Sequence, residues 1–554
     1  MRSTGDTTWP VRPIPDDVRA RYLRHGWWTD DTLGRLVERS LDAAPDAEVH
    51  IWSQTRPWHG TYADIRTEAL QLVTALTDRG VERGDAVAFQ LPNWREAVVA
   101  FYGLAMGGFV LVPIVHIYGS KEVRFVLAQS RARAYISADR YGHVDYLDIV
   151  DGSPAATLAD LRLHVVVGSS DRAPGRDVTR AGWDVVRRAV PAAPAATGDP
   201  DDVCVLAYTS GTTSDPKGVM HTHRTLLAEL MHMRSWITPE SPNLMGSPVT
   251  HATGMLGAVL GPMQVGQDIH LIDRWDPTRA LDIMLEAGIG AGTGASVFLA
   301  SIIDHPAFSP EHARHMHRVG LGGAPVPSAL AERAAAHGIA IIRAYGSTEH
   351  PSVTGGSYDD PAPKRHGTDG RPMLGVEIRL LDEDGGPVAF GQAGEIWSRG
   401  PDLCVGYTDP SLCVGAFDDD GWYRTGDMGV IDEDGYLTIT DRLQDVIIRG
   451  GENLSAAEIE EAIATLPQIA EVAVVAAPDT RLGEHACAVV RLAVDVTSIE
   501  LRDITAQLVN VGLARQKWPE DLRVVSDFPR TASGKIRKVD LRRELRASAE
   551  RNAG

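Results

Sequence analysis

A polar segment that follows an apolar run is the feature that most constrains the fold and chemistry of this chain. Residues 203–207 are apolar and predict a buried strand. Residues 208–218 then combine glycines, hydroxyl side chains and Lys217. Glycines let backbone amides converge on an anion, hydroxyls add neutral donors, and the ammonium supplies a mobile positive charge. The segment therefore predicts a strand followed by a loop that binds the outer phosphates of a nucleotide.

Taken alone, this segment excludes one common phosphate-binding motif but leaves a simpler interpretation open. A Walker P-loop requires Gly-Lys followed by Ser or Thr, whereas Lys217 precedes Gly218 and Val219, so that motif is excluded. A surface turn rich in small polar residues fits the same composition. The remainder of the chain has to decide between the turn and the phosphate loop.

Further motifs follow in a fixed order. They are residues 322–325 (Gly-Gly-Ala-Pro), 345–349 (Tyr-Gly-Ser-Thr-Glu), 423–427 (Tyr-Arg-Thr-Gly-Asp), 441–445 (Asp-Arg-Leu-Gln-Asp) and 529–535 (Pro-Arg-Thr-Ala-Ser-Gly-Lys). With the phosphate loop, this ordered set resembles the adenylate-forming superfamily of acyl-CoA synthetases, luciferases and peptide-synthetase adenylation domains. The resemblance covers residues 27–545. It implies an enzyme that activates a carboxylic acid with ATP through an acyl adenylate.

Length and patterning predict an α/β protein with more than one domain. The chain has 554 residues, more than one hydrophobic core usually serves. Helical and strand patterns alternate along most of it, which indicates layered sheets and helices. The resemblance implies a large N-terminal AMP-binding and acyl-binding domain, residues 1–443, and a small mobile α+β lid domain, residues 444–554, with a hinge near Gln444. In the lid, the spacing of Ser455 with Glu458 and of Thr497 with Glu500 predicts two capped helix starts.

The resemblance also assigns the catalytic positions. Attack of a carboxylate on the α-phosphate of ATP brings two anions together, so cations and donors must neutralise the charge. Lys535 matches the adenylation lysine of the family, and Glu349, after Thr348, matches the carboxylate that holds Mg²⁺ against the phosphates. An exposed lysine in a basic tail and a solvent-facing glutamate are the simpler interpretations of each residue alone.

The same motifs imply the nucleotide contacts. Tyr345 would stack on adenine opposite the 323–325 turn, Asp427 would accept both ribose hydroxyls, and Arg442 would contact ribose or phosphate. A core tyrosine, a turn aspartate and a surface arginine are the structural alternatives. The predicted ATP-binding residues are Thr209, Ser210, Gly211, Thr212, Thr213, Lys217, Gly323, Ala324, Pro325, Tyr345, Gly346, Ser347, Asp427 and Arg442.

Residues 248–255 match the acyl-pocket region of the family. His251 is predicted to be a wall or gate of this pocket, next to Gly254, and a core or surface histidine is the alternative. Amino-acid-activating relatives place an aspartate in this segment, whereas this chain has none and continues with apolar residues. A fatty, alicyclic or aromatic acid is therefore expected. Residues 113–119 resemble cyclohexanecarboxylate-type ligases, and Gly450 with Gly451 would let the pantetheine arm of CoA pass close to the backbone.

Two positions depart from the family pattern. Gln444 stands where aspartate or lysine is common, and Ser214 stands where glycine is frequent. The implied substrates are a small carboxylic acid, ATP and CoA, with Mg²⁺ as cofactor. A stand-alone enzyme that loads a carrier protein and a catalytically silent nucleotide-binding regulator remain alternatives. Formation of a homo-oligomer is left open.

Composition bears on other classes of protein. The net charge of −20, from 54 basic and 74 acidic residues, argues against a nucleic-acid-binding surface. Four cysteines without metal-type spacing, and termini without a secretory or peroxisomal signal, predict a cytoplasmic protein. The uncharged segment 97–115 is long enough to span a membrane, but its glycines and proline favour a buried helix and then a strand at 109–112. No integral membrane segment is expected. Glu311, His312, His315 and His317 are expected on a solvated face rather than in a metal site.

Overall fold

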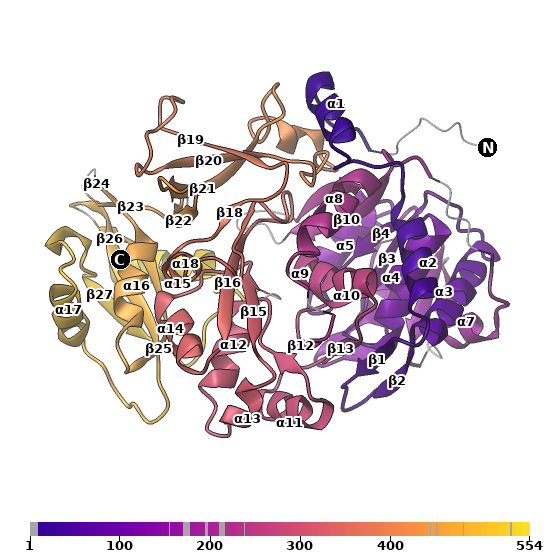
Figure 1. Cartoon of the computed structure of the whole chain (residues 1–554), viewed down its shortest axis with the longest axis horizontal. Coiled ribbons are helices and arrows are strands. Elements are labelled where there is room, and N and C mark those ends of the chain that lie inside the picture. Colours follow the sequence, from indigo (N-terminus) through magenta and orange to yellow (C-terminus); the bar gives the residue numbers. More distant parts are fainter. Residues whose placement is uncertain are drawn as a thin grey trace.

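A seven-stranded sheet organises the first part of the chain (Figure 1). Its strands are β3 (Ala86–Gln90), β4 (Val110–Pro113), β5 (Ala134–Ala138), β8 (Leu163–Val167), β9 (Thr179–Gly182), β10 (Val203–Thr209) and β11 (Lys217–Thr222). They lie in the order β11-β10-β4-β3-β5-β8-β9, with parallel pairing except between β10 and β11. Strands β3, β4, β5 and β8 are buried along their whole length, as helix-covered parallel strands require. This computed structural model describes residues 9–154, 156–169, 178–193, 198–209, 216–237, 239–443, 445–449, 452–479, 481–531 and 534–553.

The uncharged segment 97–115 is a buried helix followed by a buried strand, as predicted. Helix α4 (Arg95–Gly107) is buried from its second residue onward, and β4 begins one residue later than expected. Helix α4 packs against α3 (Tyr62–Thr77) and α2 (Leu33–Ala43). Across the described ranges, we find no helix with the length and apolar character needed to cross a bilayer. The other helices around this sheet are α5 (Ser120–Gln129), α6 (Tyr146–Asp151), α7 (Asp184–Arg188) and α8 (His223–Met233).

A five-stranded sheet lies beside the first. Its order is β14 (Gly290–Ala291), β12 (Asn243–Met245), β13 (Ile269–Leu271), β1 (Glu48–Ile51) and β2 (Trp58–Thr61). The pairing is parallel except between β1 and β2, so β2 forms an antiparallel edge. The associated helices are α9 (Ala252–Gly254), the π-helical turn η1 (Met255–Leu260), α10 (Gly261–Val265), α11 (Pro277–Ala287), α12 (Ser296–Ile303) and α13 (Pro310–Ala313).

Two four-stranded sheets follow in the chain. The first consists of β15 (Arg318–Gly322), β16 (Ala340–Tyr345), β17 (Thr354–Gly355) and β18 (Arg371–Pro372), with helices α14 (Ser328–Ala336) and α15 (Ala362–Gly367). The second is an antiparallel meander of β19 (Glu377–Leu381), β20 (Gly394–Arg399), β21 (Tyr423–Ile431) and β22 (Leu437–Arg442). Strand β16 ends at Tyr345, where the 345–349 motif starts, and β21 begins with the 423–427 motif. A hydrogen bond from Tyr345 to Asp427 joins the two sheets at these motifs.

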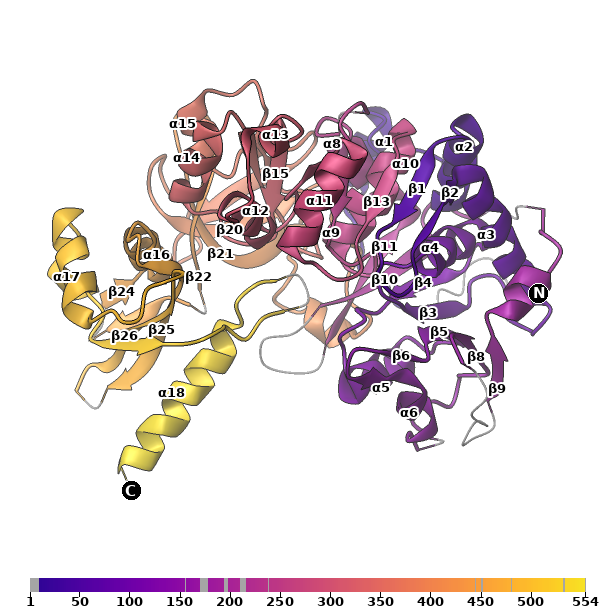
Figure 2. The ribbon, with the colours of Figure 1, turned by 90° about the horizontal axis from the view of Figure 1, so that it is seen from below.

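The C-terminal domain is a small sheet with helices on both faces, seen at the side of the molecule in Figure 2. Its strands are β23 (Ile447–Arg449), β24 (Glu452–Leu454), β25 (Ile469–Asp479), β26 (Gly483–Leu492) and β27 (Asp521–Val524). Alternate residues of β25 enter two cores: Val474 faces α16 (Ala456–Ala464) and α17 (Leu501–Asn510), and Val475 faces α18 (Lys538–Ala553). The predicted α/β class with a small C-terminal domain is confirmed.

Of the two helix caps predicted in this domain, one is correct and one is wrong. The Ser455 side chain accepts a hydrogen bond from the backbone amide of Glu458 and caps α16, as predicted. Helix α17 is capped instead by Glu500 and Asp503, which exchange side chain to backbone hydrogen bonds. Thr497 therefore lies outside the helix, because the reciprocal pair satisfies the first amides three residues later.

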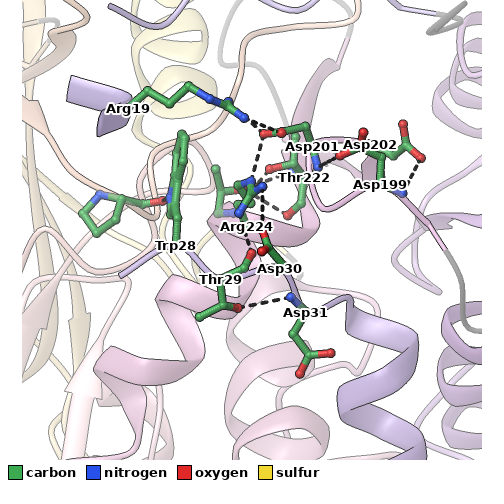
Figure 3. A network of polar contacts seen from close by, with 12 residues as sticks. Arg19, Trp28, Thr29, Asp30, Asp31, Asp199, Asp201, Asp202, Thr222 and Arg224 are labelled. Atoms are coloured by element: carbon green, nitrogen blue, oxygen red, sulfur yellow. Dashed lines mark hydrogen bonds and ion pairs between the residues drawn. The ribbon is translucent and has the colours of Figure 1, made fainter. Parts of the chain in front are cut away.

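The N-terminal segment is bound to α8 by a network of ion pairs (Figure 3). The buried guanidinium of Arg224 pairs with Asp30 at 3.2 Å and with Asp201 at 3.1 Å. Arg19, in helix α1 (Asp16–Arg24), pairs with the same Asp201 at 2.5 Å. Trp28 follows α1 and donates from its indole nitrogen to the carbonyl of Pro401 at 2.8 Å. The segment thus joins α8 to the loop after β20.

We expect Arg224→Ala to lower the free energy of unfolding by about 1–3 kcal/mol, because buried charge-assisted hydrogen bonds are lost and their acceptors are left behind. Chemical denaturation with fluorescence detection measures the change. Arg234→Ala is the matched control, since Arg234 is exposed at the end of the same helix and should shift stability by no more than about 0.5 kcal/mol. Equal losses in both variants would contradict a structural role for the network.

Candidate active site

Three predicted nucleotide-binding residues meet at one carboxylate. Asp427 in β21 lies opposite Arg442 in β22, and Arg442 Nε is 3.0 Å from Asp427 Oδ1. Tyr345, the last residue of β16, donates from its hydroxyl to Asp427 Oδ2 at 2.7 Å. Asp427 is buried, whereas the Arg442 side chain is 55% exposed. The cluster therefore joins two sheets and remains accessible from one side.

Glu349 is a buried carboxylate whose main chain and side chain are both fixed. Its Oε1 accepts a hydrogen bond from the Tyr407 hydroxyl at 2.9 Å, and its carbonyl accepts from the Cys404 amide at 2.8 Å. His221 Nε2, from β11, lies 2.8 Å from the Thr348 carbonyl. Because a carbonyl can only accept, this nitrogen carries the proton. Neighbouring segments thus hold residues 348 and 349 from two sides.

The turn before Glu349 depends on Gly346. Ser347 donates from its amide to the His350 carbonyl at 2.9 Å, which closes the turn. A Cβ atom at Gly346 would lie 1.9 Å from the carbonyl oxygen of Pro351, so a side chain does not fit there. The backbone of this motif is thereby held in the conformation that buries Glu349.

Lys217, which follows the predicted phosphate loop, lies next to Tyr407. Thr209 and Lys217 are cross-strand partners in the β10–β11 hairpin, one on each side of the loop. Lys217 Nζ is 5.6 Å from the centre of the Tyr407 ring, within the range of a cation–π contact. Since Tyr407 also contacts Glu349, the two predicted motifs share one neighbour. The predicted ligands Ser210, Gly211, Thr212 and Thr213 lie outside the described residues.

Lys535 of the C-terminal domain lies close to these groups. Burial lowers the pKa of Lys535 to about 8, and the charge of Arg442 adds to this effect. Asp427 and Glu349 act on the same pKa in the opposite direction. All three charges must lie near the ammonium to act on it, so the structure brings the tail lysine to the buried carboxylates of the N-terminal part.

Direct contacts also join the two parts of the chain. Ser328, at the start of α14, donates from its amide to Glu461 Oε1 in α16 at 3.1 Å. A Cβ atom at Gly534 would lie 2.9 Å from a methyl group of Val297. The predicted hinge residue Gln444 and the predicted CoA contacts Gly450 and Gly451 lie outside the described residues. The next residue, Asp445, forms an ion pair with Arg542 of α18.

His251 is partly buried at the start of α9, on the side where Lys535 lies. Its Nδ1 accepts a hydrogen bond from the Thr253 amide at 3.3 Å. Burial and, to a smaller extent, the charge of Lys535 lower the pKa of His251 to about 4. The ring is therefore neutral at physiological pH. Gly254 is required next to it, because a Cβ atom there would lie 2.0 Å from the Pro248 carbonyl oxygen.

The apolar residues after His251 form a π-helical turn rather than a regular helix. Met255, Leu256, Val259 and Leu260 are buried in the largest core cluster. Single π-helical turns frequently occur at functional sites. The predicted 323–325 turn lies nearby, since a Cβ atom at Gly323 would be 3.8 Å from Thr253 Oγ1. Gly323 has a φ of +73°, and the Pro325 carbonyl accepts from the Ser296 hydroxyl at 3.0 Å. The segment predicted to form the acyl pocket and the turn predicted to contact adenine are thus neighbours.

Tyr407 and His221 contact the predicted site residues but were not themselves predicted. Tyr407 contacts Glu349 and His221 contacts Thr348, each far away in the sequence, so no local residue spacing indicates either contact. The expected solvated face is wrong for His312, which is buried and whose Nδ1 accepts from the Ser309 amide at 3.2 Å. Glu311 and His317 are exposed, as expected. Among the described residues, none of the histidines at 312, 315 and 317 belongs to a group with metal-type geometry.

A large layered domain and a small C-terminal domain that carries Lys535 form the two-domain arrangement expected of an adenylate-forming enzyme. The sequence profile of AMP-binding enzymes matches residues 37–408, and that of the AMP-binding enzyme C-terminal domain matches residues 458–535. The chain therefore belongs to the AMP-binding enzyme family.

Individual relatives align along nearly the whole chain. The medium-chain fatty-acid–CoA ligase of Escherichia coli (strain K12) is 32% identical over 530 residues, covering 95% of this chain and 93% of the relative. The feruloyl-CoA synthase of an Amycolatopsis species is 29% identical over 549 residues, covering 98% and 100%. The crystal structure of the anthranilate CoA ligase AuaEII in complex with anthranoyl-AMP superimposes with a TM-score of 0.83 at 25% identity, covering 95% and 98%.

Proposed function

We propose that this chain is an ATP-dependent carboxylic acid:CoA ligase whose acid is an apolar fatty, alicyclic or aromatic one. In the first step the carboxylate oxygen attacks the α-phosphorus of ATP, pyrophosphate leaves, and an acyl adenylate forms. In the second step the thiol of CoA attacks the acyl carbonyl, AMP leaves, and a thioester forms. The observation that carries the proposal is the cluster of Tyr345, Asp427 and Arg442, together with the packing of Gly534, next to Lys535 in the C-terminal domain, against Val297.

Each residue has a separate role in the first step. Lys535 supplies positive charge where the substrate carboxylate and the α-phosphate meet. The charges of Arg442, Asp427 and Glu349 act on its ammonium group, which can donate hydrogen bonds to a bound anion. Asp427 accepts the ribose hydroxyls, with Tyr345 and Arg442 holding its carboxylate in place. Lys217, at the end of the loop, attracts the outer phosphates.

The residues around Glu349 fit a magnesium ion. Mg²⁺ prefers oxygen ligands and commonly uses one or two carboxylates while keeping several waters. Glu349 offers a buried carboxylate with one oxygen engaged by Tyr407, and Thr348 precedes it. When bound, the ion neutralises negative charge on the phosphates. Tyr407 and the Cys404 amide orient Glu349 for that contact.

An apolar acid is supported by the neutral His251 ring and by the apolar turn after it. No aspartate stands in residues 248–255 to pair with a substrate ammonium. The relatives named above are a fatty-acid ligase, a feruloyl-CoA synthase and an anthranilate ligase, so related chains are named for acids of this general kind.

The proposal includes a domain rotation between the two steps. If Lys535 acts in adenylation in this orientation, CoA would need another orientation of the C-terminal domain for the second step. We place the boundary at 443/444, with the hinge at Gln444 and the pantetheine arm passing Gly450 and Gly451. A cytoplasmic location belongs to the same proposal and is supported by the low cysteine content.

A panel of carboxylic acids tests the function. Acid-dependent release of pyrophosphate, followed by a CoA thioester detected by mass spectrometry, is the expected result. Pyrophosphate release with several acids but no CoA thioester with any of them would favour an enzyme that loads a carrier protein. ATP binding without acid-dependent pyrophosphate release would favour a nucleotide-binding regulator.

The lowered pKa of Lys535 predicts how adenylation depends on pH. A lysine is charged below its pKa, so kcat/KM for pyrophosphate exchange should be constant below about pH 8 and fall above it. Lys535→Arg should be slower but should lose this alkaline decrease, because the arginine stays charged. An unchanged alkaline limb in Lys535→Arg would assign the titration to another group.

A further inference from the structure

Three histidines lie side by side across the five-stranded sheet. His50 in β1 is the register partner of His59 in β2 on one side and of His270 in β13 on the other. The rings stack, with centroids 4.1 Å apart for His50 and His59 and 4.5 Å apart for His50 and His270. Residues directly opposite in a sheet point to the same face, so the backbone register itself assembles this row.

A carboxylate is directed at two of these rings. Glu48 precedes His50 by two residues and therefore shares its face of the strand. Its Oε2 is 2.7 Å from His50 Nε2 and 3.3 Å from His59 Nε2. The two imidazole nitrogens thus already point at one common atom, although they come from different strands.

His270 has a different role in the row. Its Nδ1 accepts a hydrogen bond from the Trp52 indole at 3.3 Å, which leaves the proton of the neutral ring on Nε2. Burial lowers the pKa of His270 to about 3, so the ring is neutral. It packs against His50 as a flat support and has no free lone pair to offer.

We propose that Glu48, His50 and His59 form a binding site for a divalent transition metal of the Zn²⁺ class. Neutral imidazole nitrogens and a carboxylate oxygen are the ligands that zinc accepts in proteins, and the ligand atoms lie within 4.8 Å of one another. To bind the metal, His50 and His59 carry their protons on Nδ1 and direct unprotonated Nε2 atoms at the ion. The Glu48 carboxylate, which contacts both Nε2 atoms in the metal-free chain, shifts to make room for the ion and becomes its third ligand. Water fills the remaining positions, because His59 and Glu48 are 58% and 47% exposed.

The site is separate from the nucleotide site. Strands β1 and β2 lie at the opposite side of the molecule from the C-terminal domain that supplies Lys535 (Figure 1). Mg²⁺ is a poor competitor here, because it prefers oxygen ligands. A bound metal would tie the edge strand β2 to β1, so it should stabilise the folded chain rather than take part in adenylation.

Calorimetric titration of the tag-free, nucleotide-free chain with ZnCl₂ tests the site. We expect one Zn²⁺ per chain with micromolar affinity, a loss of at least about tenfold in His59→Gln and in Glu48→Gln, and a rise in unfolding temperature on metal addition that both variants lack. His143→Gln is the matched control, since His143 is exposed and lies outside the row. Both substitutions in the site are at partly exposed positions, so the variants should fold.

A second measurement locates the ion. Anomalous scattering from zinc-soaked crystals should place a peak between His50, His59 and Glu48. Binding that persists unchanged in His59→Gln and Glu48→Gln, or an anomalous peak at another place, would overturn the proposal. Absence of heat and of a thermal shift at millimolar Zn²⁺ would overturn it as well.

Discussion

Replacing Lys535 with alanine is expected to reduce acid-dependent pyrophosphate exchange by about 100- to 1,000-fold, the usual effect of removing one preorganised donor from a developing negative charge. Binding of ATP should weaken much less, because Lys217, Asp427 and Tyr345 remain in place. The measurement is exchange of labelled pyrophosphate into ATP with a saturating acid. Titration of ATP under the same conditions separates the two effects.

The physical reason is that Lys535 is partly buried among charges of both signs. Its ammonium lies near the positive Arg442 and the negative Asp427 and Glu349, and its pKa is lowered to about 8. An ammonium held in this way before ATP arrives needs no reorganisation when charge develops on the phosphate. Alanine leaves that charge to water or to Arg442, which is committed to Asp427.

Two controls separate catalysis from folding. Lys121→Ala removes an exposed lysine from α5 and should leave exchange unchanged. In Lys535→Ala, thioester formation from added acyl adenylate should be largely preserved, because that step has no attack at phosphorus. Equal loss of both half-reactions would mean that Lys535 acts through the fold of its domain.

Much of this architecture follows from local sequence patterns. The apolar runs at 86–91, 163–167 and 203–207 are β3, β8 and the first part of β10, because continuous apolar residues suit strands covered on both faces. The ordered motifs likewise predict the family that the sequence profiles confirm. The helix cap predicted at Thr497 is wrong, because Glu500 and Asp503 have the same three-residue spacing as Thr497 and Glu500. Only the observed hydrogen bonds show which pair caps α17.

What sequence patterns could not provide are contacts between distant segments. Tyr407 and Glu349 are 58 residues apart, and their hydrogen bond depends on how the loop after β20 packs against the loop after β16. The row of His59, His50 and His270 depends on strand register, which spacing along one strand does not define. Neither contact leaves a periodic signal, because each involves single residues of separate elements.

A buried ionic network behind Glu349 is another such contact. Asp402 Oδ1 is 3.2 Å from His350 Nε2, and Asp402 Oδ2 accepts from the Ser352 amide at 3.2 Å. His232 Nδ1 lies 3.7 Å from Asp402 and 3.8 Å from Glu229. All of these side chains are nearly inaccessible to solvent. Asp402 therefore fixes the chain on the C-terminal side of Glu349.

The charges in this network depend on one another. Burial acts to raise the pKa of Asp402, but His350 and His232 outweigh it and hold that pKa below its usual range. Burial acts to lower the pKa of His232, yet Glu229 and Asp402 raise it to about 9. Asp402 is thus ionised and His232 protonated near neutral pH, and each charge needs the other.

Asp402→Asn is expected to lower the free energy of unfolding by about 3–5 kcal/mol, because removing one partner leaves a buried charge without compensation. Chemical denaturation of the whole chain measures this loss. Asp419→Asn, at an exposed position, is the matched control and should change stability by no more than about 0.5 kcal/mol.

The same substitution should also affect the use of Mg²⁺. Asp402→Asn releases the chain after Glu349, so the Mg²⁺ concentration needed for half-maximal pyrophosphate exchange should rise.

The pH dependence and a double substitution identify charge as the cause. The pKa of His232 is about 9 in the folded chain and about 6.5 in the unfolded chain, so protonation of His232 stabilises the fold. This contribution is complete below about pH 6.5 and is lost as the pH rises through about 9. Asp402→Asn should flatten this decline, since it removes a group that raises the pKa. If charge coupling is the origin, His232→Gln should cost less in the Asp402→Asn background than in the parent chain. Additive losses, with an unchanged pH profile, would instead attribute the destabilisation to the hydrogen bonds of Ser352 and His350.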